Sequence, residues 1–257
     1  MEERGEIDIR ECTTVEEFDQ CVRLQREAFG LPDLELSPRR HLIVARSAGG
    51  FTLGAFDGER LVGFVLNQLA ARRSPETGAE ETIGYSHMMA VAKDYQNRGV
   101  GARLKWAQRA RVVAEGRRFI RWTWDPMQSR NAHFNLNRLG VVVRSYAENY
   151  YGTDYSTVTG KFDASLGLDS DRLVAEWELD SPRVEAFARG EQPEELGKPE
   201  AAVEIIPEWS AVVREDTERA RAELQRVRTE FNDALARGLH CAAFDRAGAR
   251  YLFYSDK

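Results

Sequence analysis

The stretch Asp94-Tyr-Gln-Asn-Arg-Gly-Val-Gly-Ala-Arg-Leu104 decides how this sequence is interpreted. Residues 82–91 before it favour a strand, and the apolar spacing after it favours a helix. Gly99 and Gly101 allow the backbone to bend so that successive N–H groups point into one concavity, where the positive end of the helix dipole also lies. A strand, a bent loop and a helix N-terminus in this order are typical of a site for phosphate oxygens.

The spacing excludes two other kinds of phosphate-binding loop. The sequence contains no G-x-x-x-x-G-K-[ST] stretch, so it has no P-loop. A dinucleotide-binding loop would need G-x-G-x-x-G within a βαβ unit. Here the third glycine is missing, and the preceding segments are antiparallel in style.

The segments upstream predict the order strand, helix, helix and three strands. Thr14 and Glu17 have the spacing of a capping box, and Asp57-Gly58 between two apolar runs indicates a hairpin. The predicted elements are residues 7–10, 14–29, 38–46, 51–56, 61–66 and 82–91, with a helix stop at Gly30-Leu-Pro32 and a polar loop over 73–80.

The segments downstream predict further helices and strands, then a Glu-, Pro- and Gly-rich stretch. Gly116 and Gly140 each fit a helix end. The predicted elements are a helix over 100–114, a strand over 119–124, a helix over 129–139, paired strands over 141–146 and 173–179, a strand over 203–206, a helix over 214–237 and a hairpin formed by 241–244 and 251–254. The predicted organisation is a domain over 1–180, a linker over 181–199 and an extension over 200–257, whose packing on the same core is left open.

Composition and charge narrow the functional classes. The chain has 257 residues, of which 42% are hydrophobic and 30% charged, a balance that excludes disorder as the default. The net charge of −6 argues against an electrostatic nucleic-acid binder. Residues 101–150 contain ten Lys or Arg against three Asp or Glu, whereas residues 151–200 contain five against twelve. The basic segment indicates either a local anion site or a solvated helix face.

Other features fit a cytoplasmic protein. No run of 18 apolar residues occurs, and the first residues are polar and acidic, so no membrane span or secretion signal is expected. The three cysteines, Cys12, Cys21 and Cys241, are expected to be reduced and structural. The four histidines lack metal-ligand spacing, so no metal is expected.

The decisive stretch resembles the GNAT acyltransferase superfamily, whose fingerprint is [QR]-x-x-G-x-[GA] after a strand and a short turn. Gln96, Gly99 and Gly101 match the fingerprint, and Asp94-Tyr95 matches the turn. The resemblance covers about residues 7–179 and implies an α+β fold. Its sheet would be mixed, mostly antiparallel and twisted, split by an acyl-CoA groove and covered by helices on both faces.

The segments Thr123-Trp-Asp-Pro126 and Asn131–Gly140 are similar to a little-characterised subgroup of predicted acetyltransferases with C-terminal extensions. In the family, an Asn of the second segment's helix often contacts the cofactor. Asn131 and Asn135 are therefore candidates, with surface or capping roles as the alternative.

The family resemblance also implies how an acyl-CoA would bind. Backbone amides of the loop would bind the pyrophosphate: Gln96, Asn97, Arg98, Gly99, Val100, Gly101 and Ala102. The end of the preceding strand would bond the pantetheine arm and polarise the thioester carbonyl: Met89, Ala90 and Val91. Four cations flank the loop and are candidates for the phosphates: Arg98, Arg103, Lys105 and Arg109.

The sequence indicates the catalytic acid and base less directly than it indicates the acyl-CoA loop. The family often places a Tyr, the general acid, four residues before the Gly that ends the later helix, where this sequence has Leu136. Tyr150 and Tyr151 are other candidate acids, or else ordinary strand aromatics. An amine nucleophile must lose a proton to a base near the strand at which the sheet would be split, and His87 and Glu81 are candidates for this base. A packed core histidine is the alternative for His87.

Three functions remain open. The first is an acyl-CoA-dependent N-acyltransferase, most simply an acetyltransferase, that acts on an amine of a small molecule or protein. The second is a non-catalytic acyl-CoA-binding or scaffold protein, which Leu136 keeps open. The third is an interaction module built around residues 200–257. The expected partners are acyl-CoA and an unidentified amine acceptor, without nucleic acid or membrane, and a homodimer is left open.

Overall fold

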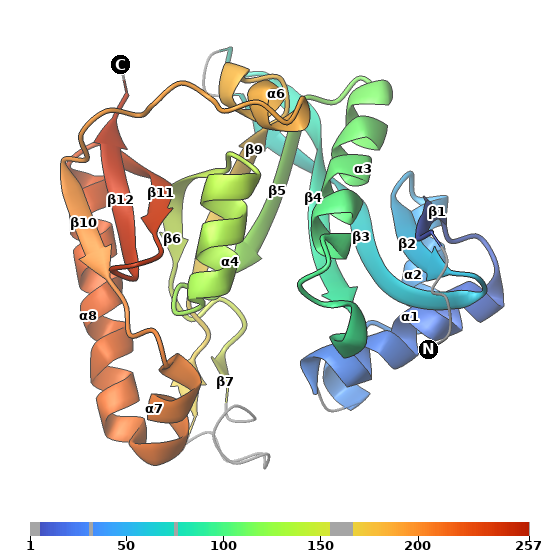
Figure 1. Cartoon of the computed structure of the whole chain (residues 1–257), viewed down its shortest axis with the longest axis horizontal. Helices are drawn as coiled ribbons and strands as arrows, with labels where there is room; N and C mark the ends of the chain where they lie inside the picture. Colours follow the sequence, from blue (N-terminus) through green and yellow to red (C-terminus); the bar gives the residue numbers. More distant parts are fainter. Residues whose placement is uncertain (1–5, 31–32, 75–76, 155–166, 257) are drawn as a thin grey trace. The chain divides into compact units, whose positions relative to one another are not determined.

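The computed structural model describes residues 6–30, 33–74, 77–154 and 167–256. Its contacts divide the chain into unit 1, Met1–Ile120, and unit 2, Arg121–Lys257. Each unit combines helices with antiparallel strand pairs (Figure 1), which confirms the predicted α+β fold class. No helix within the described ranges is long and apolar enough to cross a membrane.

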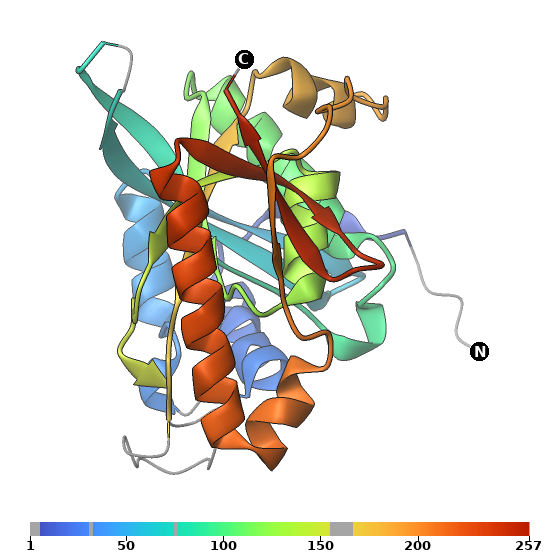
Figure 2. The same cartoon turned by 90° about the vertical axis from the view of Figure 1, so that its left-hand side faces the viewer.

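Unit 1 contains four antiparallel strands in the order β1-β2-β3-β4. Helix α3 lies on one face of these strands, and α1 and α2 lie on the other (Figure 1 and Figure 2). The strands are β1 (Asp8–Glu11), β2 (Phe51–Asp57), β3 (Arg60–Arg73) and β4 (Glu80–Val91). The helices are α1 (Val15–Phe29), α2 (Arg39–Ser47) and α3 (Val100–Ala114), with 3-10 turns η1 (Asp33–Glu35) and η2 (Lys93–Tyr95).

Local interactions explain the start and end of α1. The Glu17 carboxylate accepts the Thr14 N–H at 3.0 Å, and the Thr14 hydroxyl accepts the Glu17 N–H at 3.3 Å, which confirms the predicted capping box. Gly30 ends the helix in the left-handed region, at φ +64°. Leu31 and Pro32 of the predicted helix stop lie outside the described residues.

Strand β3 is longer than its sequence predicts. The expected strand ended at residue 66, yet β3 continues to Arg73. Residues 67–73 pair with β4 down to Glu80, so the neighbouring strand satisfies their backbone hydrogen bonds. Apolar patterning could not reveal this part of the strand, because it is only partly covered.

A β-bulge interrupts β4 close to its C-terminal end. Leu66 of β3 pairs with Met88 and Asn67 pairs with Ser86, so His87 is the extra residue. A bulge bends the strand and redirects side chains. Ser86 contacts α3, whereas His87, on the other face of the strand, contacts α2 and the segment before it.

Unit 2 contains strands in the order β5-β9-β6-β11-β12-β10 and a separate pair, β7 and β8. The strands are β5 (Phe119–Trp124), which spans the division between the units, β6 (Val142–Ala147), β7 (Thr153–Asp154), β8 (Leu168–Asp169), β9 (Arg172–Glu178), β10 (Ala201–Glu204), β11 (Leu239–Asp245) and β12 (Arg250–Ser255). The helices are α4 (Ser129–His133), which continues as the π-helical turn η3 (Phe134–Arg138), α6 (Pro182–Ala188), α7 (Trp209–Glu215) and α8 (Thr217–Ala236).

The C-terminal residues continue the sheet of unit 2. Cys241 of β11 pairs with Val143 of β6, and α8 lies along this sheet (Figure 2). The Phe231 ring of α8 contacts the Tyr251 and Phe253 rings of β12 at centroid distances of 5.1 and 4.7 Å. Residues 200–257 therefore share a sheet with β6 and β9.

Two segments of unit 2 differ from their sequence-based interpretation. The single helix predicted over 214–237 is two helices, because Asp216 adopts φ −149° and ψ 88° and its carboxylate caps α8 at the Arg219 N–H. The stretch predicted as a linker contains α6, which Ser181 caps and whose Val184 is fully buried. The domain boundaries at 180 and 199 stay a prediction.

Candidate functional site

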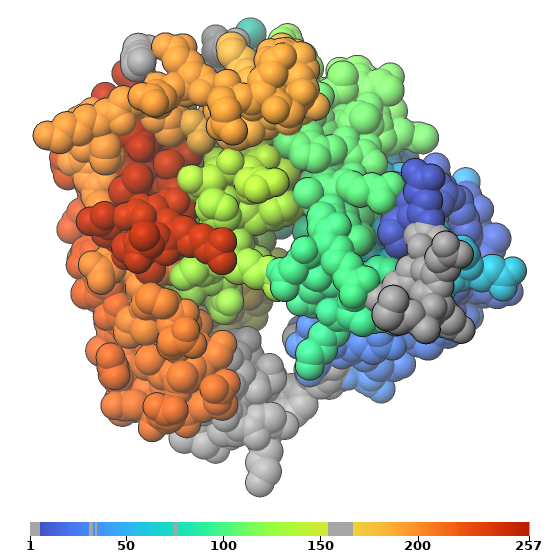
Figure 3. All heavy atoms as spheres, in the orientation of Figure 1, coloured from blue at the N-terminus to red at the C-terminus, as the bar shows by residue number. Residues whose placement is uncertain are grey.

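The loop between β4 and α3 presents backbone N–H groups at the surface of unit 1. Gly99 is the N-cap of α3 at φ +79°, and Asn97 also has a positive φ of +61°. No side chain among the described residues caps α3, so the N–H groups of its first turn are available to a ligand. The part of unit 1 that contains this loop, coloured green, reaches the surface on the face shown in Figure 3.

Gly99 and Gly101 differ in backbone conformation and in the space around them. The positive φ of Gly99 favours glycine, although a Cβ there would meet nothing within 4 Å. A Cβ on Gly101 would lie 3.5 Å from Met89 Cε and 3.8 Å from Val91 Cγ2, which is ordinary van der Waals contact. The fold therefore tolerates a methyl group at 101, which would lie against Met89 and Val91 of β4, whereas the space beside Gly99 is open.

The loop is tied to the strands beside it. Gln96, the first residue of the fingerprint, donates its Nε2–H to the Val91 carbonyl at 3.1 Å. The buried Tyr95 donates its hydroxyl to Asp57 of β2. Arg60 and Arg98 lie over the Tyr95 ring, 5.4 and 5.6 Å from its centroid. These contacts hold the backbone of the loop in place before any ligand arrives.

Lys105 does not flank the loop, which contradicts the prediction for this cation. Its side chain is 2% exposed, and its Nζ donates to Ser86 Oγ at 2.8 Å and to Gln108 Oε1 at 3.2 Å. Position 105 lies beside Leu104 on the strand-facing side of α3, so the chain turns the amine inward. Arg98 and Arg103 are exposed, and Arg103 also donates to the Ile7 carbonyl at 2.7 Å.

A second polar group, the His87 cluster, surrounds the bulge on the other face of β4. It consists of Gln25, Ser37, His41, Gln68 and His87. His87 Nε2 lies 3.3 Å from Ser37 Oγ, and its ring meets the His41 ring edge to face, with centroids 5.4 Å apart. His41 Nε2 lies 2.7 Å from Gln68 Nε2. Burial lowers the pKa of the His87 imidazole below its ordinary value, and the charge of nearby His41 lowers this pKa further.

Comparison with known proteins identifies the strand–loop–helix arrangement. Residues 16–140 match the sequence model of the Acetyltransferase (GNAT) family. Residues 16–140 are therefore similar to a GNAT acetyltransferase domain. Proteins of this family transfer acetyl groups from acetyl-CoA.

Solved structures agree with the GNAT fold. The ribosomal-protein-S18-alanine N-acetyltransferase from Escherichia coli is 13% identical, with a TM-score of 0.51 over 68% of this chain and 96% of that one. A putative acetyltransferase of the GNAT family from Desulfovibrio desulfuricans is 15% identical, with a TM-score of 0.50 over 68% of this chain and 99% of that one. No curated protein matches the sequence.

Among the candidate catalytic residues, Glu81 lies away from the His87 cluster. Six strand positions separate Glu81 from His87, which corresponds to about 20 Å along β4. The Glu81 carboxylate instead accepts the Arg72 Nε–H at 2.9 Å, and this hydrogen bond lowers its pKa. Tyr150 and Tyr151 follow β6 in unit 2, where they are 48% and 61% exposed and their rings meet edge to face.

The two candidate asparagines, Asn131 and Asn135, differ in burial. Asn131 is exposed, whereas Asn135 is buried and its backbone carbonyl accepts the Val141 N–H at 3.1 Å. The helix widens into a π-turn from Phe134 onward, so the spacing of four residues no longer places two side chains one above the other. Leu136, at the position where the family often has its Tyr, is fully buried.

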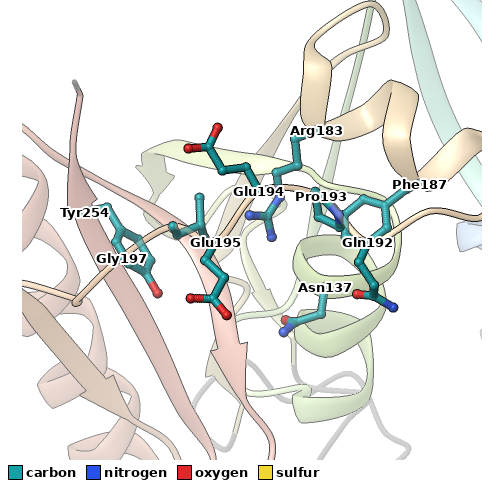
Figure 4. A pocket seen from close by; sticks show the side chains of 10 residues that line it. Asn137, Arg183, Phe187, Gln192, Pro193, Glu194, Glu195, Gly197 and Tyr254 are labelled. Carbon is teal, nitrogen blue, oxygen red and sulfur yellow. The ribbon is translucent and has the colours of Figure 1, made fainter.

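Unit 2 also contains an open pocket of about 360 Å³ (Figure 4). Its lining includes Asn137, Arg183, Phe187, Glu195 and Tyr254. The Arg183 guanidinium group points toward Asn137 in this view, and its Nη2 donates to the Leu136 and Ala242 carbonyls at 3.3 and 3.2 Å. Arg183 thus satisfies backbone groups of the π-turn and of β11. No group of three or more His, Cys, Asp or Glu side chains within the described ranges could hold a metal ion.

The sequence did not indicate Ser37, His41 or Gln68 as members of a site. Ser37 lies 50 positions from His87, and neither belongs to a motif. One signal was visible: Gln25 falls among the apolar positions of α1, and it is fully buried there. A polar side chain at such a position needs a hydrogen-bonding partner.

Proposed function

We propose that this protein is an acyl-CoA-dependent N-acyltransferase, most simply an acetyltransferase, that acts on an amine of a small molecule or protein. The observation that carries the proposal is the N-terminus of α3, which no described side chain caps, with open space beside its N-cap residue Gly99. The amides of residues 97–102 would bind the pyrophosphate of acyl-CoA, held in place by Gln96. Met89, Ala90 and Val91 would bond the pantetheine arm. A cytoplasmic location and the absence of nucleic-acid and membrane partners stay predictions.

His87 is the proposed general base. The amine nitrogen attacks the thioester carbonyl carbon, a C–N bond forms, the C–S bond breaks, and CoA leaves as a thiolate. The proton lost from nitrogen passes to the imidazole of His87, whose lowered pKa keeps it neutral near pH 7. We do not assign this role to Glu81, because its carboxylate is paired with Arg72 at the far end of β4.

The leaving group needs little help from an acid. A thiol has an ordinary pKa of about 8.5, so a CoA thiolate is a tolerable leaving group near neutral pH. Leu136 cannot give a proton, and the exposed Tyr150 and Tyr151 remain the candidate acids. Of the two asparagines, exposed Asn131 is the better candidate for contact with the cofactor.

One observation favours a second function, that of an acyl-CoA-binding or scaffold protein without catalysis. The family's acid position is occupied by Leu136, which is fully buried and packed as a core residue. Incubation with acetyl-CoA and a panel of primary amines, with CoA release and acylated product both measured, separates the two functions. Acylation of any amine above the uncatalysed rate supports the enzyme, and CoA binding without product supports the binding protein.

Cofactor binding is tested by melting temperature. Acetyl-CoA at about a hundred times its dissociation constant is expected to raise the melting temperature by roughly 5–10 °C, which corresponds to about 2.7 kcal/mol. The variant Gly101→Ala is expected to reduce this shift while melting near the parent temperature, because its methyl group fits the free protein. Gly101→Glu should abolish the shift by adding bulk and negative charge.

Gly99→Ala is the matched control for Gly101→Ala. It should lower the melting temperature of the free protein, because alanine is strained at φ +79° by about 1 kcal/mol. An unchanged acetyl-CoA shift in Gly101→Glu, or no shift in the parent protein, would contradict the assignment of this loop.

A further inference from the structure

We propose that Ser37 is a positioning residue for His87: its hydroxyl accepts the Nε2–H of the imidazole and leaves Nδ1 to take the proton from the acceptor amine. This inference rests on the proposed function. It concerns the segment between η1 and α2, which no sequence motif marked.

Ser37 is held by a buried side chain from another helix. Gln25 of α1 is fully buried, its Oε1 accepts the Ser37 N–H at 2.8 Å, and its Nε2 donates to the Ser37 carbonyl at 3.1 Å. A buried glutamine with both ends engaged fixes the backbone of the residue that it binds. Gln25 therefore fixes the backbone from which the Ser37 side chain extends toward His87.

The hydroxyl meets one nitrogen of the His87 ring and leaves the other without a partner. Ser37 Oγ lies 3.3 Å from Nε2, and Nδ1 has no hydrogen-bonding partner among the residues described here. A serine oxygen can accept from an N–H, and the hydrogen bond made at one ring nitrogen sets the protonation of the other. With the proton on Nε2, the lone pair for catalysis is on Nδ1.

The surroundings of the ring keep it neutral and oriented. His41 from α2 packs edge to face against it, and Ser37 meets it from the segment before α2. Gln68 of β3 lies behind His41, with its Nε2 2.7 Å from the His41 ring nitrogen. Gln25, Ser37 and Gln68 carry no charge, so the His41 imidazole is the titratable group of this cluster that faces His87.

The reaction step follows from this arrangement. As the amine attacks, its N–H proton transfers to His87 Nδ1, the C–S bond breaks, and the electron pair leaves with the CoA sulfur. The resulting imidazolium retains its Nε2–H bond to Ser37 Oγ. Ser37 contacts neither substrate nor cofactor in this scheme and acts through the ring alone.

The experiment compares the parent protein with Ser37→Ala and Ser37→Thr. The two hydrogen bonds of Gln25 go to the Ser37 backbone, so Ser37→Ala keeps them and is expected to fold. We expect Ser37→Ala to lower kcat about tenfold or more, with an unchanged KM for acyl-CoA, and Ser37→Thr to restore most of kcat because it keeps a hydroxyl.

A spectroscopic measurement tests the tautomer without turnover. In protein labelled with ¹⁵N at histidine, the ring-nitrogen shifts of His87, assigned with His87→Gln, should show a protonated Nε2 and an unprotonated Nδ1 near pH 7.5. Ser37→Ala should show a mixture of both tautomers. A parent ring protonated at Nδ1, or full kcat in Ser37→Ala, overturns the positioning role and leaves the proposed function intact. A parent protein that acylates no amine overturns both.

Discussion

Ser86 and His87 are neighbours on β4, yet they belong to polar clusters on opposite faces of unit 1. Ser86 belongs to the Lys105 cluster, which consists of Asn67, Ser86, Lys105 and Gln108 and is buried throughout. Within it, Gln108 Nε2 donates to Asn67 Oδ1 at 2.9 Å, and the Ser86 hydroxyl donates to Gln108 Oε1 at 3.2 Å. His87 belongs to the His87 cluster, in which Gln25 and Ser37 are buried and His41, Gln68 and His87 are partly exposed.

The two clusters differ in whether all of their polar side chains find partners within the cluster. In the Lys105 cluster the four side chains bond one another away from solvent, which suits a structural role. In the His87 cluster the imidazole makes one hydrogen bond, and its second nitrogen remains for a ligand. Successive side chains of a strand point to opposite faces, which separates Ser86 from His87, and the bulge leaves His87 without a paired residue on β3.

The largest expected effect is a loss of turnover on substitution in the His87 cluster. His87→Ala should lower turnover by about a hundredfold or more, in the range of general bases, while the acetyl-CoA melting shift persists. Because the base must be neutral and burial lowers its pKa, the acid limb of kcat/KM in the parent protein should lie below pH 6.5. A variant that keeps full turnover would show that the base lies elsewhere.

A substitution in the Lys105 cluster should instead lower the stability of the protein. Gln108→Ala removes the acceptor of Lys105 Nζ and Ser86 Oγ and the donor to Asn67. Unfolding in urea should show a loss of about 1–3 kcal/mol, the usual cost of leaving buried polar groups unsatisfied. Turnover per folded molecule should stay within about twofold of the parent. A hundredfold loss of turnover without destabilisation would show that the Lys105 cluster is not merely structural.

The smallest effect concerns the buried amine itself. Burial lowers the pKa of Lys105 well below its ordinary value, so the unfolded state binds more protons between that lowered pKa and about 10.4. The free energy of unfolding should therefore rise with pH across this window. In Lys105→Met, Gln108 Oε1 still accepts the Ser86 hydroxyl, so the variant should be more stable at pH 7 by about 1 kcal/mol.

Unfolding measured at pH 7, 8.5 and 10 checks this expectation. The stability difference between Lys105→Met and the parent protein should shrink as the pH rises. A difference that is constant or grows with pH would mean that Lys105 folds in its charged form.

Sequence patterns predicted the elements better than the site. The capping box at Thr14, the helix stop at Gly30 and the paired strands around Val143 and Ala175 were all confirmed. Each depends on contacts within a few residues or on apolar spacing. Residues 67–73 of β3 were missed, because their pairing with β4, and not their composition, makes them a strand.

The sequence alone determined that a strand, a bent glycine loop and a helix follow one another at residues 82–114, since turn geometry and helix initiation are local properties. Tertiary structure decided which side chains meet. It turned Lys105 inward, opened a π-turn that separates Asn131 from Asn135, and brought Ser37 to His87 across 50 positions. These outcomes depend on helix packing and strand register, which combine residues from distant segments and leave no signature in any one of them.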